Sequence, residues 1–527
     1  MNEFEHLPRV LTAKEMAAVD KYTIETLDIP GRVLMENAGR AVFAVIRERW
    51  APLAGKRFAV LCGRGNNGGD GFVVARYLHE VGACCDVFLV GSAKELRGDA
   101  QANHAVLTRL GCAVRQIQSL ETMPELRHAD LIVDALLGTG VRGPLQGLMG
   151  QIVTRINESG RPVVAIDLPT GMDADTGEIV GPCVRAETTV TMGCRKQGLL
   201  FSPAREHAGK LIVAEIGFPA AAFRNVAKNP ETKLATYLLA GPVLSAWVPR
   251  RPPTAFKNRV GQILVIAGSL GFGGAARLTA VATLRAGAGL VVLAAPESLV
   301  PGLEAATAEV IKLPLPEENG TLGAAAIDRL QTRLSWAEVI ALGPGLGISA
   351  GAGAVVKHVL AEFLGTIVLD ADGLNLLAGQ QELIRRAAGK IILTPHPGEL
   401  SRLTGADKAA IAHNPVAVAR QTAENLGQVL VLKGAPTVVA SPTGEVFINS
   451  TGNAGMATGG SGDVLTGIIA GLAGQGLDPL RAALLGVYLH GLAGDLARDR
   501  LGEWSLMAGD IIEHLPLALQ QLANHNG

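Results

Sequence analysis

The sequence lacks several features that would assign it to a specialised class of protein. Its 527 residues include six cysteines, all before residue 195, so a secreted protein held by disulfides is not expected. Lys and Arg number 47 against 48 Asp and Glu, and the formal net charge of -1 leaves no basic surface for nucleic acid. No uninterrupted apolar run approaches the length of a membrane span. We therefore expect neither nucleic acid nor a membrane as a partner.

A leader segment and a cysteine-based metal site are also not indicated. The first residues, MNEFEHLPRVLTAKE, are charged and lack the apolar core of a signal peptide. Cys84 and Cys85 are adjacent, without metal-ligand spacing, and buried reduced thiols are the simpler interpretation. Both observations favour a cytoplasmic protein. Apolar residues make up 48% of the chain and charged residues 18%, which is typical of a well-packed globular protein.

The length and the hydrophobic pattern predict two α/β domains. A chain of 527 residues is too long for one ordinary core. Short β-branched runs such as LIVDALLG and TIVLDADG alternate with Ala- and Leu-rich stretches such as GFVVARYLHEVG, which predicts parallel sheets covered by helices on both faces. The alternation breaks in residues 218–253, where we expect no strand and place the boundary. The predicted domains are residues 1–222 and 232–527.

In the first half, a glycine-rich polar loop follows an expected strand. GRGNNGGDGF, residues 63–72, comes after the strand FAVLC and before a helix, and its glycines permit a tight turn and close backbone approach to a ligand. The loop is not the GxGxxG dinucleotide fingerprint, and it lacks the lysine of a P-loop. Asn66, Asn67 and Asp70 favour a binding loop over a purely structural turn.

Two carboxylates close further strands of the same half. Asp134 ends the apolar run of LIVDALLGTGVRGP, and VVAIDLPTG supplies Asp167 and Thr170. Each carboxylate alone is also explained as the cap of a following helix. Because ligands sit beyond the carboxyl ends of parallel strands, the whole set favours one site at one sheet edge. Oxygen ligands from Asn, Asp and Thr suit a hard cation of low charge demand better than zinc.

The motifs NNGGDG, VDALLGTGVRGP and DLPTG, in this order and spacing, resemble the NAD(P)H-hydrate epimerase family over most of residues 10–220. The resemblance implies a Rossmann-like sheet and interconversion of the R and S forms of hydrated NADH or NADPH at C6. It implies a potassium ion held by Asn67, Asp134 and Thr170, the last being often Ser in the family. The hydrate-binding residues that it implies are Asn66, Asn67, Gly68, Gly69, Asp70, Gly138, Thr139, Gly140, Val141, Arg142, Gly143, Pro144 and Asp167.

The chemistry of the hydrate gives Asp167 a role. C6 of the hydrate carries both the ring nitrogen and a hydroxyl group. The nitrogen lone pair can expel the hydroxyl, or the ring can open, and re-addition from the other face then inverts the centre. Either route needs a group that gives and takes a proton, and Asp167 is the candidate. The sequence leaves both routes open.

In the second half, three polar loops follow expected strands and a fourth precedes an apolar helix. GPGLG, PHPGE and KGAPT are the first three, and TGNAGMATGGSGDVLTG is the fourth. Glycines before a helix present backbone N–H groups, and with the helix dipole they form an anion hole for a transferring phosphoryl group. Asp463, at the helix start, can accept the proton of an attacking hydroxyl. Taken singly, His396 is also explained as a capping or packed residue, Lys433 as a solvated lysine and Asp463 as an N-cap.

These four motifs resemble the ADP-dependent NAD(P)H-hydrate dehydratase branch of the ribokinase-like fold over roughly residues 235–520. The resemblance implies ADP as co-substrate, assistance from Mg²⁺ and Asp463 at the reacting hydroxyl. The hydrate-binding residues that it implies are Ala267, Gly345, His396, Pro397, Gly398, Glu399, Leu400, Ser401, Arg402 and Asp463. The nucleotide-binding residues that it implies are Lys433, Gly434, Ala435, Pro436, Thr437, Asn453, Ala454, Gly455, Met456, Ala457, Thr458, Gly459, Gly460, Ser461 and Gly462.

The predicted fold class is therefore α/β, with two three-layer αβα domains: an N-terminal Rossmann-like parallel sheet and a C-terminal ribokinase-like sheet. The whole chain is similar to bifunctional enzymes that repair hydrated nicotinamide nucleotides. Phosphoryl transfer from ADP would turn the C6 hydroxyl into a better leaving group and give NAD(P)H, AMP and phosphate. Two alternatives stay open, a small-metabolite kinase with a regulatory first half and a nucleotide-sensing scaffold without turnover. We also expect a homo-oligomer.

Overall fold

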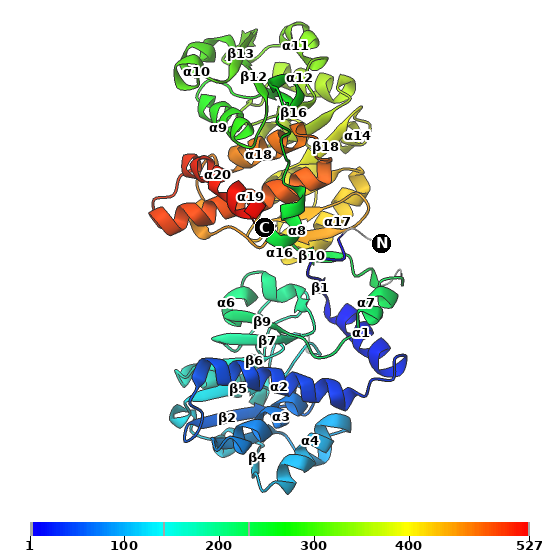
Figure 1. The fold of residues 1–527 in the computed structure, drawn as a ribbon, viewed down its shortest axis with the longest axis vertical. Coiled ribbons are helices and arrows are strands. Elements are labelled where there is room, and N and C mark those ends of the chain that lie inside the picture. The colour runs from blue at the N-terminus through cyan, green and yellow to red at the C-terminus, as the bar shows by residue number, and fades with distance from the viewer. Residues whose placement is uncertain (1–3, 141–142, 230–231, 525–527) are drawn as a thin grey trace. The chain divides into compact units, whose positions relative to one another are not determined.

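The computed structural model describes residues 4–140, 143–229 and 232–524, which form two compact units (Figure 1). The first unit is Arg9–Ala235, and the second comprises residues 4–8 and 236–524. Residues 4–8 thus belong to the second unit, where the rings of Phe4 and Phe447 pack edge-on with their centroids 4.7 Å apart. The sequence around Phe4 carries no signal for this placement, because the contact joins residues more than 400 positions apart.

The first unit is built on a seven-stranded sheet with the order β4-β3-β2-β5-β6-β7-β9, and all of its strand pairs are parallel. A separate parallel pair joins β1 (Val10–Leu11) to β8 (Arg195–Lys196). The strands of the main sheet are β2 (Arg57–Cys62), β3 (Cys84–Val90), β4 (Val114–Ile117), β5 (Leu131–Ala135), β6 (Val163–Ile166), β7 (Thr188–Met192) and β9 (Lys210–Ala214).

Alternating residues of this sheet pack on opposite faces, as the two-residue period of a strand requires. Val60 and Cys62 share a core with α2, α3 and α4, whereas Ala59 and Leu61 share another with α5. The predicted three-layer αβα architecture is therefore confirmed for this unit. Its helices are α1 (Ala13–Glu25), α2 (Gly31–Trp50), α3 (Asn66–Glu80), α4 (Gly98–Arg109), α5 (Gly147–Glu158), α6 (Ala204–Ala208) and α7 (Ala220–Val226).

The second unit contains a ten-stranded sheet with the order β10-β21-β20-β19-β18-β17-β16-β11-β12-β13. Its pairs are parallel except that β20 runs antiparallel to β19 and β21, a difference from the fully parallel sheet predicted. The strands are β10 (Thr236–Leu238), β11 (Gln262–Ile266), β12 (Leu290–Pro296), β13 (Ile311–Leu315), β16 (Val339–Leu342), β17 (Thr366–Leu369), β18 (Lys390–Leu393), β19 (Val429–Leu432), β20 (Val438–Ala440) and β21 (Val446–Ile448). A short hairpin joins β14 (Glu317–Glu318) to β15 (Thr321–Leu322).

Strand β10 corrects the expectation that residues 218–253 carry no strand. It is only three residues long, too short to show an alternating pattern, and it forms because it pairs with β21 at the sheet edge. The expectation of buried thiols also needs correction. Cys62, Cys183 and Cys194 are buried and free, whereas Cys84 is exposed.

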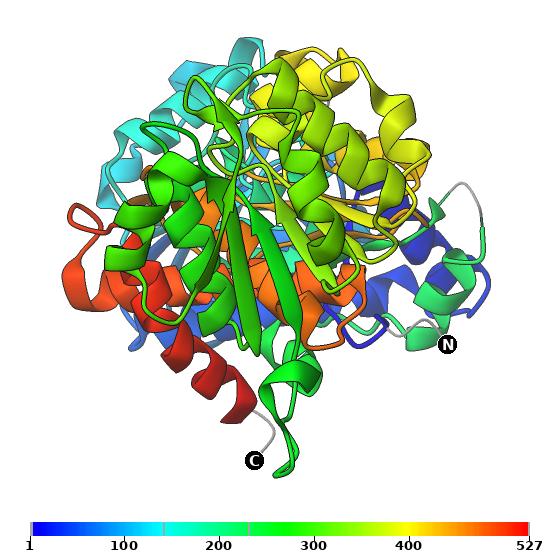
Figure 2. The same cartoon turned by 90° about the horizontal axis from the view of Figure 1, so that it is seen from above.

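Helices cover both faces of the second sheet, which confirms its three-layer prediction (Figure 2). The apolar helix α18 packs closely on α9, because side chains at Gly467 and Gly471 would come within 2.3 and 2.5 Å of α9 carbonyl oxygens. The helices of this unit are α8 (Gly241–Leu244), α9 (Gly273–Arg285), α10 (Val300–Ala306), α11 (Ala326–Leu334), α12 (Ala350–Glu362), α13 (Asp372–Asn375), α14 (Gln381–Arg385), α15 (Pro397–Thr404), α16 (Lys408–His413), α17 (Pro415–Leu426), α18 (Ser461–Gly474), α19 (Pro479–Leu501) and α20 (Ala508–Ala523).

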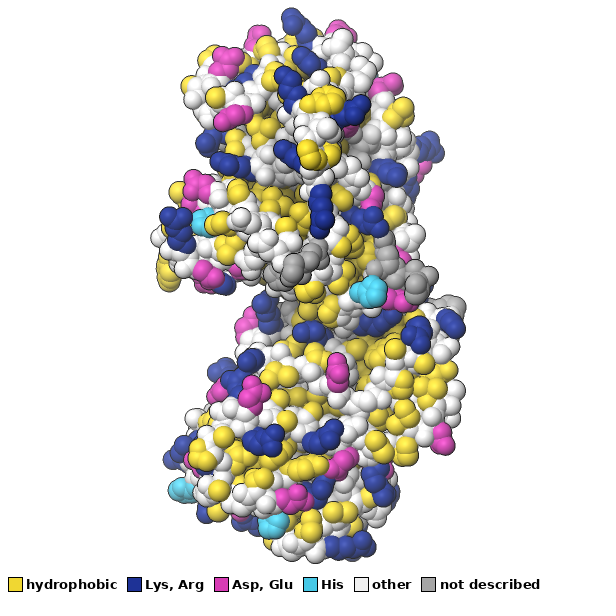
Figure 3. Space-filling view, viewed as in Figure 1, with side chains coloured by type: hydrophobic (Ala, Val, Ile, Leu, Met, Phe, Trp, Pro, Cys, Tyr) yellow, Lys and Arg dark blue, Asp and Glu magenta, His cyan; other side chains and the backbone are white. Residues whose placement is uncertain are grey.

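Surface charge and hydropathy agree with the composition. On the face shown in Figure 3, side chains of both charge signs are interspersed over each unit, as expected for a formal net charge of -1. Among the helices of the described ranges, none combines the length and the apolar character needed to cross a bilayer.

Candidate active sites

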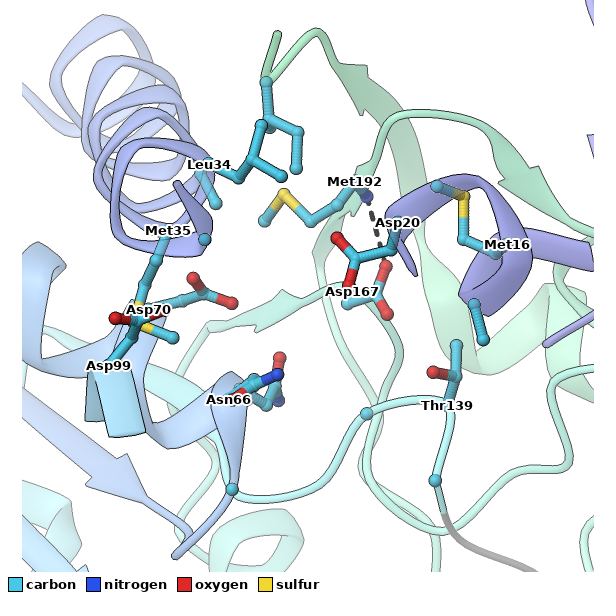
Figure 4. A pocket seen from close by; sticks show the side chains of 18 of the residues that line it. Met16, Asp20, Leu34, Met35, Asn66, Asp70, Asp99, Thr139, Asp167 and Met192 are labelled. Carbon is cyan, nitrogen blue, oxygen red and sulfur yellow. Dashed lines mark hydrogen bonds between the residues drawn. The ribbon is translucent and has the colours of Figure 1, made fainter. Parts of the chain in front are cut away.

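The first unit contains a cavity of about 540 Å³ beyond the carboxyl ends of its strands (Figure 4). Its walls come from the segments that follow β2, β5 and β6, and from α1 and α2. Of the predicted hydrate-binding residues, seven line it. These are Asn66, Asn67, Asp70, Gly138, Thr139, Gly140 and Asp167.

The remaining predicted residues of this site lie elsewhere. Gly68 and Gly69 are buried in the first turn of α3, behind the cavity wall. Gly143 and Pro144 are outside the lining, and Val141 and Arg142 lie outside the described residues. The Gly68 position requires glycine, because a side chain would come within 1.9 Å of the Gly63 carbonyl oxygen. The loop therefore turns tightly enough to bring Asn66 and Asn67 to the cavity.

Asp134 is fully buried beneath this loop and forms hydrogen bonds through both carboxylate oxygens. The Thr170 backbone N–H donates to one oxygen at 2.8 Å, and the Thr170 hydroxyl donates to the other at 2.8 Å. The Leu136 N–H adds a third bond at 3.2 Å. Burial raises the pKa of Asp134 to about 6, and these hydrogen bonds oppose the rise. Asp134 is therefore a fixed charge at the end of β5, in direct contact with Thr170.

The third predicted potassium ligand, Asn67, lies on the other side of the segment after β5. The Leu137 N–H donates to the Thr170 hydroxyl oxygen at 3.1 Å, and a side chain at Gly138 would lie 3.6 Å from Cγ of Asn67. The Nδ2 atom of Asn67 is buried and has no hydrogen-bond partner among the described residues. A buried amide N–H group without an acceptor is costly, so an acceptor atom of a bound ligand would stabilise Nδ2, whereas a cation would contact Asn67 through Oδ1. One carboxylate with neutral oxygens fits a monovalent cation better than magnesium.

Asp167 follows β6 with a backbone φ of +65°, which is uncommon for a residue with a side chain. One of its carboxylate oxygens accepts hydrogen bonds from the Thr191 hydroxyl at 3.2 Å and the Met192 N–H at 3.1 Å. The same oxygen accepts a bond from the ammonium group of Lys196. The strained backbone and the three bonds together fix the orientation of this carboxylate.

Lys196 is the main site residue that the sequence did not reveal. Its side chain is 1% exposed, and its ammonium group also donates to the Thr191 hydroxyl at 3.1 Å and the Met192 carbonyl at 2.8 Å. It lines the cavity beside Asp167. In the sequence, TMGCRKQG offers no way to distinguish this buried lysine from a surface one, because its partner lies 29 positions away, directly after β6.

Three further carboxyl groups line the same cavity, Asp20 from α1, Asp70 from α3 and Asp99 from α4. Burial raises the pKa of Asp70 well above its usual range, the charges of Asp167 and Asp20 add to the rise, and Lys196 opposes it. Burial also raises the pKa of Asp20. The cavity thus combines one lysine-paired carboxylate with acids whose pKa burial raises.

In the second unit, the side chains of Lys433, Asp370 and Thr466 form a buried hydrogen-bonded group. The Lys433 ammonium donates to one Asp370 oxygen at 2.7 Å, and the Thr466 hydroxyl donates to the other at 2.7 Å. Although burial acts to lower it, the pKa of Lys433 is raised by Asp370 and Glu399. Asp370 was not predicted as a site residue. It directly follows the buried strand β17, and Asp134 was predicted from the same kind of pattern, a carboxylate that closes an apolar strand.

Asp463 lies in the first turn of α18, next to this group. Burial raises its pKa to about 7, Asp370 adds to the rise, and Lys433 opposes it. A side chain at the adjacent Gly462 would lie 3.4 Å from the Lys433 ammonium and 4.0 Å from an Asp370 oxygen. The loop before α18 is therefore in close contact with the buried ion pair, and Asp463 can change its protonation near neutral pH.

The segment 396–402 forms the start of α15 and connects to the same charges. The backbone N–H of His396 donates to Glu399 at 2.8 Å, and a carboxylate oxygen of Glu399 lies 3.6 Å from the Lys433 ammonium. His396 accepts the Gly398 N–H through Nδ1 at 2.9 Å, so it does cap the helix, as one interpretation held. Three other residues of the predicted segment, Pro397, Leu400 and Ser401, are part of helix α15, and Leu400 is fully buried.

Arg402, Gly345 and Ala267 are each placed by neighbouring loops. Arg402 donates to Asn375 Oδ1 at 2.9 Å, on the short helix that begins at Asp372. The Gly345 carbonyl oxygen accepts a hydrogen bond from the Ser269 hydroxyl at 2.8 Å. Ser269 lies two positions after Ala267, which is buried. The loops after β11, β16 and β18 are thus held at one edge of the sheet.

The glycine-rich segment before α18 is held by Asp495, a residue of α19 that the sequence did not indicate. Its carboxylate accepts the Gly452 N–H at 2.9 Å and the Asn453 side-chain amide at 3.0 Å. Asn453 in turn accepts the Gly455 N–H at 3.0 Å. The turn at Gly460, with φ of +89°, leads directly into the helix. Backbone N–H groups at this helix start are available to an anion.

The fold and these two sites define a two-domain α/β enzyme with a separate acidic, glycine-lined site in each unit. Comparison with known proteins specifies the class. The NAD(P)H-hydrate dehydratase family model matches residues 263–517, and the model of the YjeF-related protein N-terminus matches residues 31–198.

Curated relatives match along almost the whole chain. A bifunctional NAD(P)H-hydrate repair enzyme of Moorella thermoacetica is 42% identical, covering 97% of both chains. The Salinibacter ruber enzyme of the same name is 38% identical over 97% of this chain and 96% of its own, and that of Escherichia coli is 37% identical over 95% and 92%. The chain belongs to the family of bifunctional NAD(P)H-hydrate repair enzymes, which confirms the family and the enzyme class predicted from the motifs.

A solved structure is also similar to the second half. The ADP/ATP-dependent NAD(P)H-hydrate dehydratase of Bacillus subtilis, co-crystallised with ATP/Mg²⁺, is 31% identical and covers 54% of this chain and 98% of its own, with a TM-score of 0.46.

Proposed function

We propose that the first unit interconverts the R and S forms of hydrated NADH and NADPH at C6, and that the second dehydrates the S form with ADP. The products are NAD(P)H, AMP and phosphate. The observation that carries this division is that each unit contains its own carboxylate beside a glycine-rich loop, in a segment that a different family model matches. Neither a regulatory first half nor a scaffold without turnover requires two such sites.

In the first unit, the cavity binds the nicotinamide end of the hydrate and Asp167 moves the proton. The carboxylate is fixed by Lys196, so one oxygen is occupied and the other is available to the substrate. Asn67, Asp134 and Thr170 would hold a potassium ion. When bound, this ion would position the hydrate by charge attraction without strongly polarising it.

In the second unit, the N–H groups at the start of α18 bind the transferring phosphoryl group, and Asp463 takes the proton of the C6 hydroxyl. With its pKa raised to about 7, Asp463 is ionised in a large fraction at neutral pH and is still basic enough to act. The phosphorylated oxygen then leaves, driven by the ring nitrogen. The described residues contain no His, Cys, Asp and Glu cluster suited to a metal ion, so we propose that magnesium is held mainly by the nucleotide phosphates.

Lys433 is the predicted nucleotide-binding residue whose contacts suggest a second role. Its ammonium group points to Asp370 and lies 3.6 Å from Glu399, both buried carboxylates. We infer that the positive charge of Lys433 partly offsets the negative charges near Asp463, and that Lys433 also borders the nucleotide. Cytoplasmic location and self-association stay predictions from the sequence.

The experiment is an incubation of the purified full chain with a mixture of hydrated NADH epimers, with and without ADP. We expect the absorbance of the reduced nicotinamide ring to return only with ADP, and both epimers to be consumed. AMP and phosphate should form in equal amounts with NADH. Appearance of a stable phosphorylated small molecule would instead support the kinase alternative, and ADP binding without any product would support the scaffold.

A further inference from the structure

Of the four carboxyl groups that line the cavity of the first unit, Asp70 and Asp167 come from different elements. Asp70 belongs to the first turn of α3, and Asp167 follows β6. Both line the cavity, and Figure 4 shows them on opposite sides of it, with the open space between their side chains. A flat ring that occupies this space would present one face to each carboxyl group.

The two groups have different surroundings. One oxygen of Asp167 accepts bonds from Lys196, Thr191 and Met192, while its other oxygen lies 3.6 Å from the point where a Gly138 side chain would begin. Because glycine leaves that point open, the second oxygen has room to meet a ligand. Asp167 is thus paired directly with a buried ammonium group.

Asp70 has no such cation. It is 8% exposed, and within the described ranges no hydrogen bond reaches its carboxyl group. The nearby charges are Asp167 and Asp20, which disfavour a second negative charge, and Lys196, which is already paired with Asp167. A buried carboxyl group without a donor is more stable when it carries its proton. Asp99 also lines the cavity, but it forms an ion pair with Arg32 at 3.8 Å.

We propose that the first unit inverts C6 with two carboxyl groups, one on each face of the ring, with Asp70 as the acid and Asp167 as the base. This inference rests on the proposed epimerisation and adds the route, which the sequence left open. Paired groups of unlike environment, one neutral and one ionised, are a general arrangement for acid–base chemistry in one site.

The step balances as follows. Asp70 gives its proton to the C6 hydroxyl, the C6–O bond breaks, and the lone pair of N1 forms the N1=C6 bond of a planar cation while water departs. A second water on the opposite face then attacks C6, the π pair returns to N1, and Asp167 accepts the proton released. One proton has moved from Asp70 to Asp167, and exchange with solvent or a turnover in reverse restores the start. No oxidant or other co-reactant is needed.

Ring opening predicts a different fate for the oxygen. In that route, the C6–N1 bond breaks, the hydroxyl oxygen becomes an aldehyde oxygen, and reclosure on the other face keeps the same atom. The two-carboxyl route replaces the oxygen with one from solvent at every inversion. The origin of the oxygen in the product therefore distinguishes the two routes.

The experiment follows the pure R epimer of hydrated NADH in ¹⁸O-labelled water without ADP, with the initial rate of an enzyme-free sample subtracted. We expect each S molecule formed by the full chain to carry one solvent oxygen. Unlabelled S product at the initial rate would overturn the inference. If the full chain does not accelerate inversion at all, the proposed epimerisation itself is wrong.

The variant Asp70→Asn tests the second group. We expect inversion to fall by about 10²–10⁴, the usual scale for a general acid. Inversion at the wild-type rate would remove Asp70 from the reaction.

Two controls accompany this variant. Asp86→Asn changes an aspartate of β3 that pairs with Arg115 outside the cavity, and it should invert normally. Dehydration of the S epimer with ADP by Asp70→Asn should be unchanged, which reports that the second unit is folded, and an unchanged temperature of unfolding of the first unit reports the same for that unit. A misfolded Asp70 variant would still leave the oxygen-label result on the wild-type chain to decide the route.

Discussion

Asp167 of the first unit and Asp463 of the second are both proposed to move a proton of the same C6 hydroxyl, yet their surroundings differ. Asp167 accepts a hydrogen bond directly from the buried Lys196. Asp463 has a lysine nearby, but Lys433 hydrogen-bonds to Asp370 instead, and burial with Asp370 raises the pKa of Asp463 to about 7. One carboxylate is paired with an ammonium group, whereas the other titrates near neutrality.

The difference matches the two proposed reactions. The proposed epimerisation uses a base on one face and a separate acid on the other, and the pairing with Lys196 distinguishes Asp167 from Asp70. Phosphoryl transfer needs a base that is strong enough to take a hydroxyl proton, and a raised pKa supplies that strength. The position of one ammonium group, on the reacting carboxylate or on its neighbour, therefore sets the chemistry of each unit.

The largest expected effect comes from Asp463→Asn. Dehydration should fall by about 10²–10⁴, because an amide cannot accept the hydroxyl proton. Epimerisation should stay near normal, since Asp167 lies on a separate sheet. ADP-dependent return of NADH and ADP-free inversion of the R epimer measure the two activities in one preparation. Near-normal dehydration would show that Asp463 is not the base.

A comparable change in the first unit is Lys196→Met. The Asp167 carboxylate would lose its ammonium partner in a buried position, and breaking such a pair costs about 3–5 kcal/mol. We expect a lower temperature of unfolding for this unit and strongly reduced epimerisation, with dehydration retained. Thermal unfolding and both activity assays measure this, with the exposed Lys210→Met as the matched control. Unchanged epimerisation would show that Asp167 does not depend on the Lys196 ammonium group, and the proposed difference between the two carboxylates would not hold.

The pH dependence of dehydration is the next effect. Because Asp463 must be ionised to act and its pKa is raised to about 7, the rate should increase roughly tenfold per pH unit below 7 and level off above it. Lys433→Met removes a charge that lowers the pKa of Asp463, so the rise should move to higher pH. Rates at saturating ADP from mildly acidic to mildly alkaline pH measure the profile. A profile that Lys433→Met leaves in place would limit this lysine to nucleotide binding.

Asp134→Asn should give the smallest effect. Asp134 touches Thr170 and lies outside the cavity lining, so its loss should weaken the cation rather than stop proton transfer. We expect the hydrate concentration for half-maximal epimerisation to rise by roughly tenfold, the scale of one lost charge interaction of about 1.4 kcal/mol. Replacing potassium by a bulky organic cation should do the same to the wild type. Loss of kcat with unchanged potassium dependence would instead make Asp134 an acid–base group.

The sequence by itself determined the parts of the protein that depend on neighbouring residues. Strand-end carboxylates and glycine loops were visible because a buried apolar run followed by polar residues marks the carboxyl end of a parallel strand. Asp167, Asp134 and the 63–72 loop were found in this way, and the structure brings them to one sheet edge. The family was visible for the same reason, since its motifs are these loops.

Only the tertiary structure decided which charges meet. Lys196 reaches Asp167 because β7 pairs with β6 and the chain then turns back beside it, and Lys433 reaches Asp370 across 63 positions of sequence. Asp495 holds the glycine-rich loop from a helix that follows it, and β10 forms only because β21 offers it an edge. Such contacts depend on strand order and on the packing of distant segments, and the free energy that fixes them comes from burial of the whole core rather than from any local pattern.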